Sequence, residues 1–354
     1  MTSTAYLFAH FTGTEQSATD EQIYFALSRD GIHWHDTRPN GHPALESTVG
    51  ERGVRDPFLI RAHGNGDSTA AIAAHSPRAY LLATDLSIYH RGGWATGRAR
   101  ETGSTSIVIW ETDDFAHWSE PRLAPIAAAI PGACFAWAPE ACWDEARRQY
   151  IVYWATGSHT VNAHGDFQNM YYATTRDFVR FSEPVKWIDR ESYCIDTTMI
   201  HADDGWWYRA SGDGQITIER TRNPYAVTDA PRADLETGDG VDEWAYVGIL
   251  SSIFDDDRLS GGYLEGPELF RFNESDVRVI DGRPMRYGLM CDQYRLGRGY
   301  LPFRSADLGS AARADWDAAT DVDLGSLKKR HGGVLPITDA EYAAIERAFG
   351  MMER

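Results

Sequence analysis

The chain is divided almost from end to end into short apolar runs of strand length, each bounded by turn residues. Typical runs are "AYLFAHF" (5–11), "QIYFALS" (22–28), "QYIVYWAT" (149–156) and "GWWYRAS" (205–211), separated by clusters of Gly, Asp and Asn. Short runs rich in Tyr, Trp, Ile and Val that are interrupted by turn residues predict β-strands. We therefore expect an all-β fold.

The C-terminal segment "TDAEYAAIERAFG" (338–350) departs from this pattern. Thr338 and Glu341 form a capping-box pattern, the apolar residues that follow have helical spacing, and Gly350 can end a helix. We expect one short C-terminal helix there.

An internal repeat indicates how the strands are grouped. "TDDFAHWSEP" (112–121) recurs as "TRDFVRFSEP" (175–184), 63 residues later, and weaker copies occur at 28–36 and 304–316. A period of tens of residues in an all-β chain is typical of a β-propeller. At about 70 residues per unit, a chain of 354 residues predicts a five-bladed β-propeller.

Composition narrows the classes of partner. The net charge is −18, 43% of residues are hydrophobic, and Lys and Arg are scattered, which argues against nucleic acid or membrane as a partner. The segment "MTSTAYLFAHFTG" lacks a basic n-region and a long apolar stretch, so we expect a cytoplasmic protein. The four cysteines have no zinc-type spacing and are expected to be buried thiols.

Five polar residues embedded in apolar runs recur once per expected blade. They are Asp56, Glu140, Asp196, Glu265 and His331, separated by 84, 56, 69 and 66 residues. Because the innermost strand of each propeller blade faces the central axis, these side chains are expected to converge at one pocket. Convergence would also give Glu265 partners, which a carboxylate in the apolar run "YLEGPELF" requires.

Convergent carboxylates favour glycoside hydrolysis, in which one carboxylic acid protonates the leaving oxygen and one carboxylate acts on the opposite face of the sugar. Burial and a second negative charge would raise the pKa of Glu265, as a general acid at neutral pH needs. Asp196 is a candidate for that second charge, and Asp56, beside Arg55, for the base that deprotonates a water.

The motifs "RDPFLI", "WAPE", "CIDTTMI", "LEGPELF" and "RHGGVL", in this order along nearly the whole chain, resemble glycoside hydrolase family 43. That resemblance implies five-bladed propeller enzymes acting on arabinose- or xylose-containing saccharides by inversion. It implies Asp56 as general base, Asp196 as the carboxylate that orients the acid and tunes its pKa, and Glu265 as general acid. Many members carry Asp where this chain has Glu140.

The resemblance also implies further site residues. Trp137, Glu140 and Arg295 are candidates for substrate binding, and His331 matches a position near a central metal ion or water cluster. No cofactor is expected for the chemistry, although a structural calcium or other ion near His331 is part of the prediction. For Trp137 and His331, ordinary core residues are the alternative.

We therefore expect residues 1–354 to form a single β-propeller catalytic domain that releases terminal pentose units, α-L-arabinofuranosyl first, from an oligosaccharide substrate. The alternatives are a β-xylosidase or β-galactofuranosidase of the same fold, a transglycosylase of related fold, and a non-catalytic carbohydrate-binding propeller. Serine-hydrolase, zinc-protease and nucleotide-binding motifs are absent from the sequence. The sequence leaves the oligomeric state open.

Overall fold

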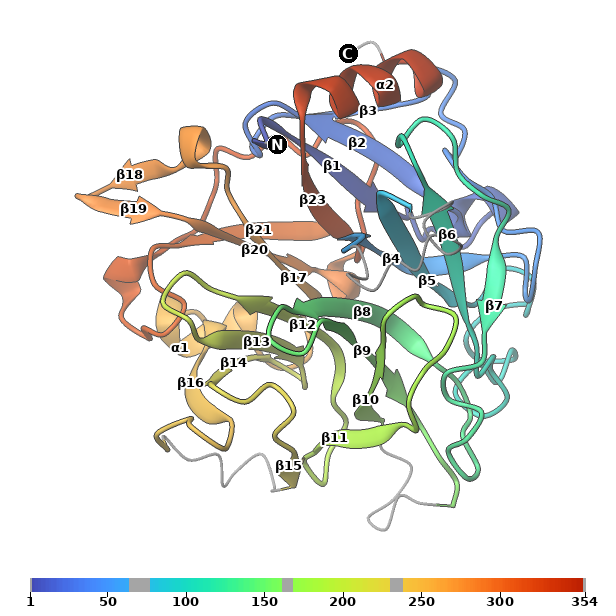
Figure 1. Cartoon of the computed structure of the whole chain (residues 1–354), viewed down its shortest axis with the longest axis horizontal. Helices are drawn as coiled ribbons and strands as arrows, with labels where there is room; N and C mark the ends of the chain where they lie inside the picture. The colour runs from blue at the N-terminus through green and yellow to red at the C-terminus, as the bar shows by residue number, and fades with distance from the viewer. Residues whose placement is uncertain (1, 64–76, 161–167, 230–237, 353–354) are drawn as a thin grey trace.

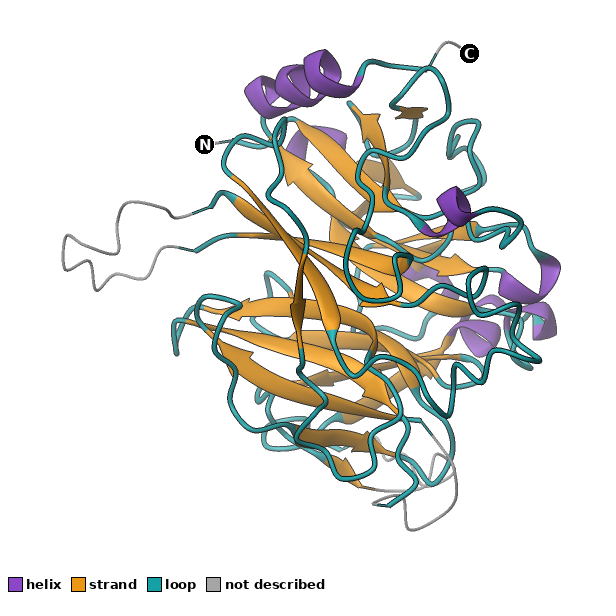
Figure 2. Cartoon of the chain, turned by 90° about the vertical axis from the view of Figure 1, so that its right-hand side faces the viewer, coloured by secondary structure: helices purple, strands orange, loops and turns teal. Residues whose placement is uncertain are grey.

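Five β-sheets surround one central axis, as the sequence predicted (Figure 1). The structure is a computed structural model that describes residues 2–63, 77–160, 168–229 and 238–352. Strands make up the body of the molecule, and helices lie at its periphery (Figure 2). The fold is a five-bladed β-propeller.

The strands of each blade are given from the axis outwards. The first blade contains β23 (Gly333–Ile337), β1 (Ala5–His10), β2 (Tyr24–Ser28) and β3 (Trp34–Asp36). The second contains β4 (Val54–Arg61), β5 (Ala79–Asp85), β6 (Ile107–Thr112) and β7 (Arg122–Ala124). The third contains β8 (Trp137–Asp144), β9 (Gln149–Thr156), β10 (Asn169–Thr175), β11 (Val185–Asp189) and β15 (Thr228–Asp229). The fourth contains β12 (Ile195–His201), β13 (Trp207–Gly212), β14 (Ile216–Thr221) and β16 (Ala245–Ile249). The fifth contains β17 (Glu265–Arg271), β20 (Tyr287–Asp292), β21 (Tyr300–Ser305) and β22 (Trp316–Asp317).

Shorter elements decorate the blades. They are the hairpin β18 (Arg278–Ile280) and β19 (Arg283–Met285), the helices α1 (Leu250–Phe254) and α2 (Asp339–Phe349), and the 3₁₀ turns η1 (Ala18–Glu21), η3 (Asp257–Leu259), η4 (Glu274–Asp276), η5 (Tyr294–Leu296) and η6 (Arg313–Asp315). None of the helices in the described residues has the length and apolar character needed to cross a membrane.

The innermost strands form a closed ring. Strand β4 packs between β23 and β8, and β12 packs between β8 and β17, while β17 also contacts β23. The first blade closes this ring because its inner strand comes from the end of the chain: β23 pairs antiparallel with β1, with Leu335 opposite Leu7. All five inner strands therefore bring their first residues to the same axis.

The repeat seen in the sequence is a turn that follows the third strand of a blade. The Oγ1 atoms of Thr112 and Thr175 donate to backbone carbonyls five residues later, and Asp114 and Asp177 each accept two backbone N–H bonds. Asp30 accepts the same pair of backbone bonds in the first blade. The turn recurs because a Ser or Thr followed two residues later by Asp or Asn satisfies the backbone groups that the strand leaves unpaired.

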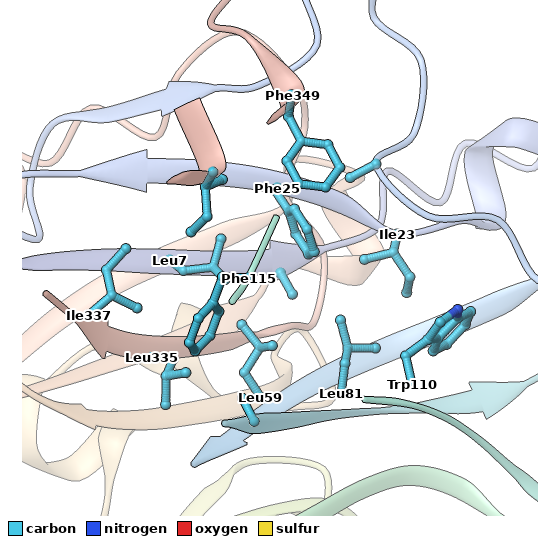
Figure 3. Packing of buried hydrophobic residues seen from close by; sticks show 14 of the residues in the cluster. Leu7, Ile23, Phe25, Leu59, Leu81, Trp110, Phe115, Leu335, Ile337 and Phe349 are labelled. Carbon is cyan, nitrogen blue, oxygen red and sulfur yellow. The ribbon is translucent and has the colours of Figure 1, made fainter. Parts of the chain in front are cut away.

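The largest cluster of buried apolar side chains joins the first and second blades to the C-terminal helix (Figure 3). Phe349 of α2 packs edge-on against Phe25 of β2, with ring centroids 5.3 Å apart. The predicted capping box is present, since Thr338 Oγ1 accepts from the Glu341 N–H and the Glu341 carboxylate accepts from the Thr338 N–H. Helix α2 is thus the predicted C-terminal helix, and its apolar side covers one end of the first blade.

Candidate active site

Four of the five inner strands begin with the same backbone irregularity. Asp56, Ala138, Asp196 and Gly266 all have positive φ, between 46° and 54°, and the pairing register with the second strand shifts at each of them. A bulge at the rim of a sheet redirects the neighbouring side chains. Here the four bulges lie at one end of the axis, and residues at or beside them line one cavity.

This cavity has a volume of about 430 Å³ and brings together Asp56, Asp196 and Glu265. Sequence positions more than 200 residues apart thereby share one pocket, as the periodic spacing predicted. Trp137 also lines the cavity and is 8% exposed. Its ring stacks on Phe135 at a centroid distance of 3.9 Å.

Glu265 lies in an environment that favours its protonated form. Its side chain is 26% exposed, and Oε1 accepts a hydrogen bond from Arg330 at 3.0 Å. Burial raises the pKa of Glu265 to about 7; Arg330 opposes this shift, and the nearby Asp292 and Asp56 carboxylates add to it. Glu265 is therefore able to hold a proton near neutral pH.

Asp196 supports the backbone that carries Glu265. Its Oδ2 accepts a hydrogen bond from the Gly266 N–H at 3.2 Å, so the β12 bulge is tied to the β17 bulge. Burial, followed by the charges of Glu265 and Asp56, raises the pKa of Asp196 well above its ordinary value.

Asp56 is fixed by a neighbouring strand of its own blade. The hydroxyl of the buried Thr84 donates to Asp56 Oδ2 at 2.9 Å, and the same hydroxyl oxygen accepts from the Ala138 N–H at 2.7 Å. Thr84 thus links the bulges of the second and third blades. The other oxygen, Asp56 Oδ1, lies 3.6 Å from His331 Nδ1.

Glu140 lies outside the residues that line the cavity and is 2% exposed. Its Oε2 accepts from the Tyr153 hydroxyl at 3.1 Å, and its Oε1 is 3.7 Å from His331 Nε2. In the bulge register Glu140 corresponds to Glu268, two residues after the bulge, and not to the cavity-lining Glu265. The sequence predicted that Glu140 contacts the substrate directly. The structure instead places its side chain outside the cavity lining.

His331 does not have the surroundings of a metal ligand. Across residues 2–63, 77–160, 168–229 and 238–352, no group of three or more His, Cys, Asp or Glu side chains is arranged to hold a metal ion. Burial lowers the pKa of His331. The calcium or other ion expected near His331 is therefore unsupported, and the residue is a buried histidine between Asp56 and Glu140.

Arg295 was also predicted to contact substrate, but it is absent from the lining of the cavity. Its guanidinium donates to the Gly261 carbonyl at 3.0 Å and lies over the Tyr263 ring. Its place beside Glu265 is taken by Arg330, which also donates to Asp292 at 2.7 Å. Arg330 was not among the site residues predicted from the sequence, although it directly precedes His331 in "KRHGGVL".

The comparison with protein families agrees with this geometry. A family model described as a probable glycosyl hydrolase domain, related to glycoside hydrolase family 43, matches residues 2–343. The chain belongs to this glycosyl hydrolase family. The fold and the family predicted from the sequence motifs are both confirmed.

This family member also resembles individual proteins. An α-L-arabinofuranosidase of Bifidobacterium longum is 29% identical over 269 residues, which cover 68% of the chain but only 22% of that relative. The crystal structure of a thermostable family-43 glycoside hydrolase superposes with a TM-score of 0.50 at 13% identity, over 83% of this chain and 78% of the other. The latter similarity concerns the fold.

Proposed function

We propose that this glycosyl hydrolase family member releases terminal pentose units, α-L-arabinofuranosyl first, from oligosaccharides with inversion of configuration. The observation that carries the proposal is the meeting of Asp56, Asp196 and Glu265 in one cavity, with the pKa of Glu265 raised to about 7. A carboxylic acid that keeps its proton near neutral pH, in one cavity with a second carboxyl group that can activate water, is what glycoside hydrolysis by acid and base catalysis requires.

In the proposed reaction Glu265 donates its proton to the glycosidic oxygen while the bond from that oxygen to the anomeric carbon breaks. Asp56 accepts a proton from a water whose oxygen bonds to the anomeric carbon from the opposite face. Asp196 acts through its hydrogen bond to the Gly266 N–H, which holds the backbone of the adjacent Glu265. Asp196 is therefore a positioning residue for the acid.

The choice of sugar rests on the similarity to the Bifidobacterium α-L-arabinofuranosidase. β-Xylosidase and β-galactofuranosidase activities would use the same carboxyl groups, and they differ in what the cavity walls accept. These walls include Glu15, Trp94 and Lys328, next to the carboxylates. No metal ion takes part in the proposed chemistry.

The test is an assay of the purified protein on nitrophenyl α-L-arabinofuranoside, β-D-xylopyranoside and β-D-galactofuranoside. We expect release of nitrophenol from the arabinofuranoside, and a kcat lowered about 10²- to 10⁴-fold in Glu265→Gln and in Asp56→Asn, the range that general acid or base catalysis contributes. Glu346→Gln, an exposed carboxylate on α2, is the matched control and should keep the wild-type rate.

The configuration of the released sugar tests the mechanism. NMR of the first product formed should show the inverted anomer, and a retained anomer would instead support a nucleophilic carboxylate and a transglycosylase. Activity on the xyloside or galactofuranoside alone would replace the proposed sugar. If all three substrates are inert, the non-catalytic carbohydrate-binding alternative takes the place of the hydrolase.

A further inference from the structure

Two further cavities adjoin the one that holds the carboxylates. The second, of about 250 Å³, shares Trp137, Ile195, Glu265 and Tyr294 with the first. The third, of about 360 Å³, shares Gln168 and Tyr193 with the second. Arg100 lines all three cavities. We call the second and third cavities together the outer groove, and its far end is lined by Cys134, Phe135, Gly157, Ser158 and His159.

The two carboxyl groups at the start of the groove give it a direction. Glu265 lines both the first cavity and the outer groove, whereas Asp56 lines the first cavity and is absent from the lining of the outer groove. A general acid protonates the oxygen of the leaving group, and the base activates water on the opposite face of the sugar. The leaving group therefore lies on the side of Glu265 away from Asp56, which is the side of the outer groove.

The walls of the outer groove suit a chain of sugars. Trp137, which is 8% exposed, lines its inner part, and the fully buried Phe135 stacks behind it at 3.9 Å and fixes the indole ring. Tyr193 lines both parts. Arg100 and Gln168 supply polar groups for hydroxyls along the same path. Aromatic side chains combined with a few placed polar groups are the usual composition of a small-molecule site.

We propose that the outer groove binds the leaving-group part of a linear oligosaccharide, with at least two sugar units beyond the scissile bond, and that Tyr193 contacts these units. The inner part of the groove holds the unit attached to the scissile oxygen, beside Glu265 and Trp137. The far part holds the next unit, against Tyr193. The direction of the groove rests on the proposed function, because it uses Glu265 as the acid. The substrate class that follows is an oligosaccharide of three or more units, from which one terminal unit is removed.

The first test measures kcat/KM on linear arabino-oligosaccharides of two to five units and on nitrophenyl α-L-arabinofuranoside, or on the xylo-series if the xyloside is the one cleaved. We expect kcat/KM to rise about tenfold from the disaccharide to the trisaccharide. Tyr193→Ala should lower kcat/KM for the trisaccharide about tenfold more than for the nitrophenyl glycoside, since truncating a central contact residue has an effect of this size. Tyr193→Phe, which keeps the ring, should restore most of the loss. Tyr89→Ala, an exposed tyrosine outside the groove, is the matched control.

The second test separates this inference from the proposed function. Calorimetric titration of Glu265→Gln protein with the same oligosaccharides should show affinity that increases from the disaccharide to the trisaccharide. If hydrolysis occurs but neither kcat/KM nor affinity depends on chain length, the groove inference is wrong and the hydrolase stands. If chain-length-dependent binding occurs without turnover by the wild-type protein, the hydrolase and the direction of the groove are wrong, and the groove stands only as an oligosaccharide-binding site. If Tyr193→Ala lowers the rates on all substrates equally, Tyr193 does not contact the distal units and the inference fails.

Discussion

Arg330 controls the charge balance of the candidate active site because it contacts two carboxylates at once. Its Nε donates to Asp292 at 2.7 Å and its NH2 group donates to Glu265 at 3.0 Å, while Asp292 lies directly opposite Glu265 in the β17–β20 ladder. The guanidinium therefore neutralises Asp292 and limits the rise in the pKa of Glu265, which its burial causes. Without this cation, Glu265 would hold its proton to a higher pH.

We predict that Arg330→Met moves the alkaline limb of the kcat/KM profile to higher pH. In the wild-type protein activity should fall as pH rises through about 7, where Glu265 loses its proton. Removing a cation that favours the carboxylate form should shift that limb upward by at least about one pH unit. The measurement is a pH–rate profile on the nitrophenyl substrate.

Lys328→Met is the control for this prediction. Lys328 lines the same cavity, but its Nζ lies 3.5 Å from the Gly13 carbonyl, and Glu265 has its hydrogen bond from Arg330 instead. Its substitution should move the limb less than Arg330→Met does. An unchanged limb in Arg330→Met, with the variant still folded by its thermal transition, would mean that Arg330 does not tune the acid.

At the scale of single residues, the three candidate catalytic carboxylates could be predicted from the sequence, but their neighbours in the site could not. Asp56, Asp196 and Glu265 were found because each stands in an apolar run at blade spacing, and the structure places all three in one cavity. Arg330 and Asp292 were missed, although an acid at the end of the buried strand β20 was a usable signal. Arg295 was chosen instead of Arg330, because the sequence does not show which arginine the turns bring to Glu265.

At the scale of elements, the bulges decide which side chains face the cavity. One polar residue per blade was counted from the sequence, four acids and His331, and Glu140 was taken as the equivalent of Glu265. The bulges shift this register: Glu140 and Glu268 occupy the same position after their bulges, and Thr198 occupies it in the fourth blade. Spacing predicted the blades and their number, but a displacement of one to three residues within a strand is seen only in the backbone.

We predict that Gly266→Ala is much more damaging than a glycine substitution with similar φ elsewhere. Gly266 has φ +54°, and a Cβ there would lie 2.7 Å from His331 Cγ and 2.8 Å from His331 Cβ. The contact should displace His331 or the bulge that holds Glu265, with a loss of about 1–3 kcal/mol beyond the backbone strain. Urea unfolding gives the stability change, and kcat should fall as well because Glu265 is the preceding residue.

Gly282→Ala separates the clash from the strain. Gly282 has φ +79° in the β18–β19 hairpin, and a Cβ there would meet no atom within 4 Å. Its substitution should cost only about 1 kcal/mol and leave kcat unchanged. Equal effects of the two substitutions on stability and kcat would show that close packing at the β17 bulge is unimportant.

At the scale of the whole molecule, two properties require strands from several blades: the closure of the ring and the gathering of acids near its axis. The blade count followed from the repeat, because the turn after the third strand needs the same residue types in each blade. The ring also brings further acids close to the site: Glu140 and Glu268 are buried outside the lining of the cavity that holds Asp196 and Glu265, and burial together with the charges of Glu268 and Asp196 raises the pKa of Glu140. Burial raises the pKa of Glu268 to about 8, beside about 7 for Glu265. Hydrogen bonds from Arg61 and Thr338, in contrast, hold the pKa of Glu341 at about 2 in spite of its burial.

These opposite shifts predict a maximum of stability near pH 5. A folded-state pKa raised above the unfolded value of about 4.3 means that the folded protein keeps a proton which the unfolded chain releases. The contribution of Glu265 and Glu268 is therefore fully present below that value and is lost as pH rises through about 7 and 8. The contribution of Glu341 is present above the same value and is lost as pH falls toward about 2. The Tm should accordingly be lower at pH 8 than at pH 5 by about 5 °C or more.

In Glu268→Gln, whose amide oxygen still accepts from the Val334 N–H, this decline in Tm should be smaller, whereas the exposed Glu346→Gln should follow the wild type. A Tm that is constant or rises between pH 5 and pH 8 would show that the axial acids are already ionised in the folded protein.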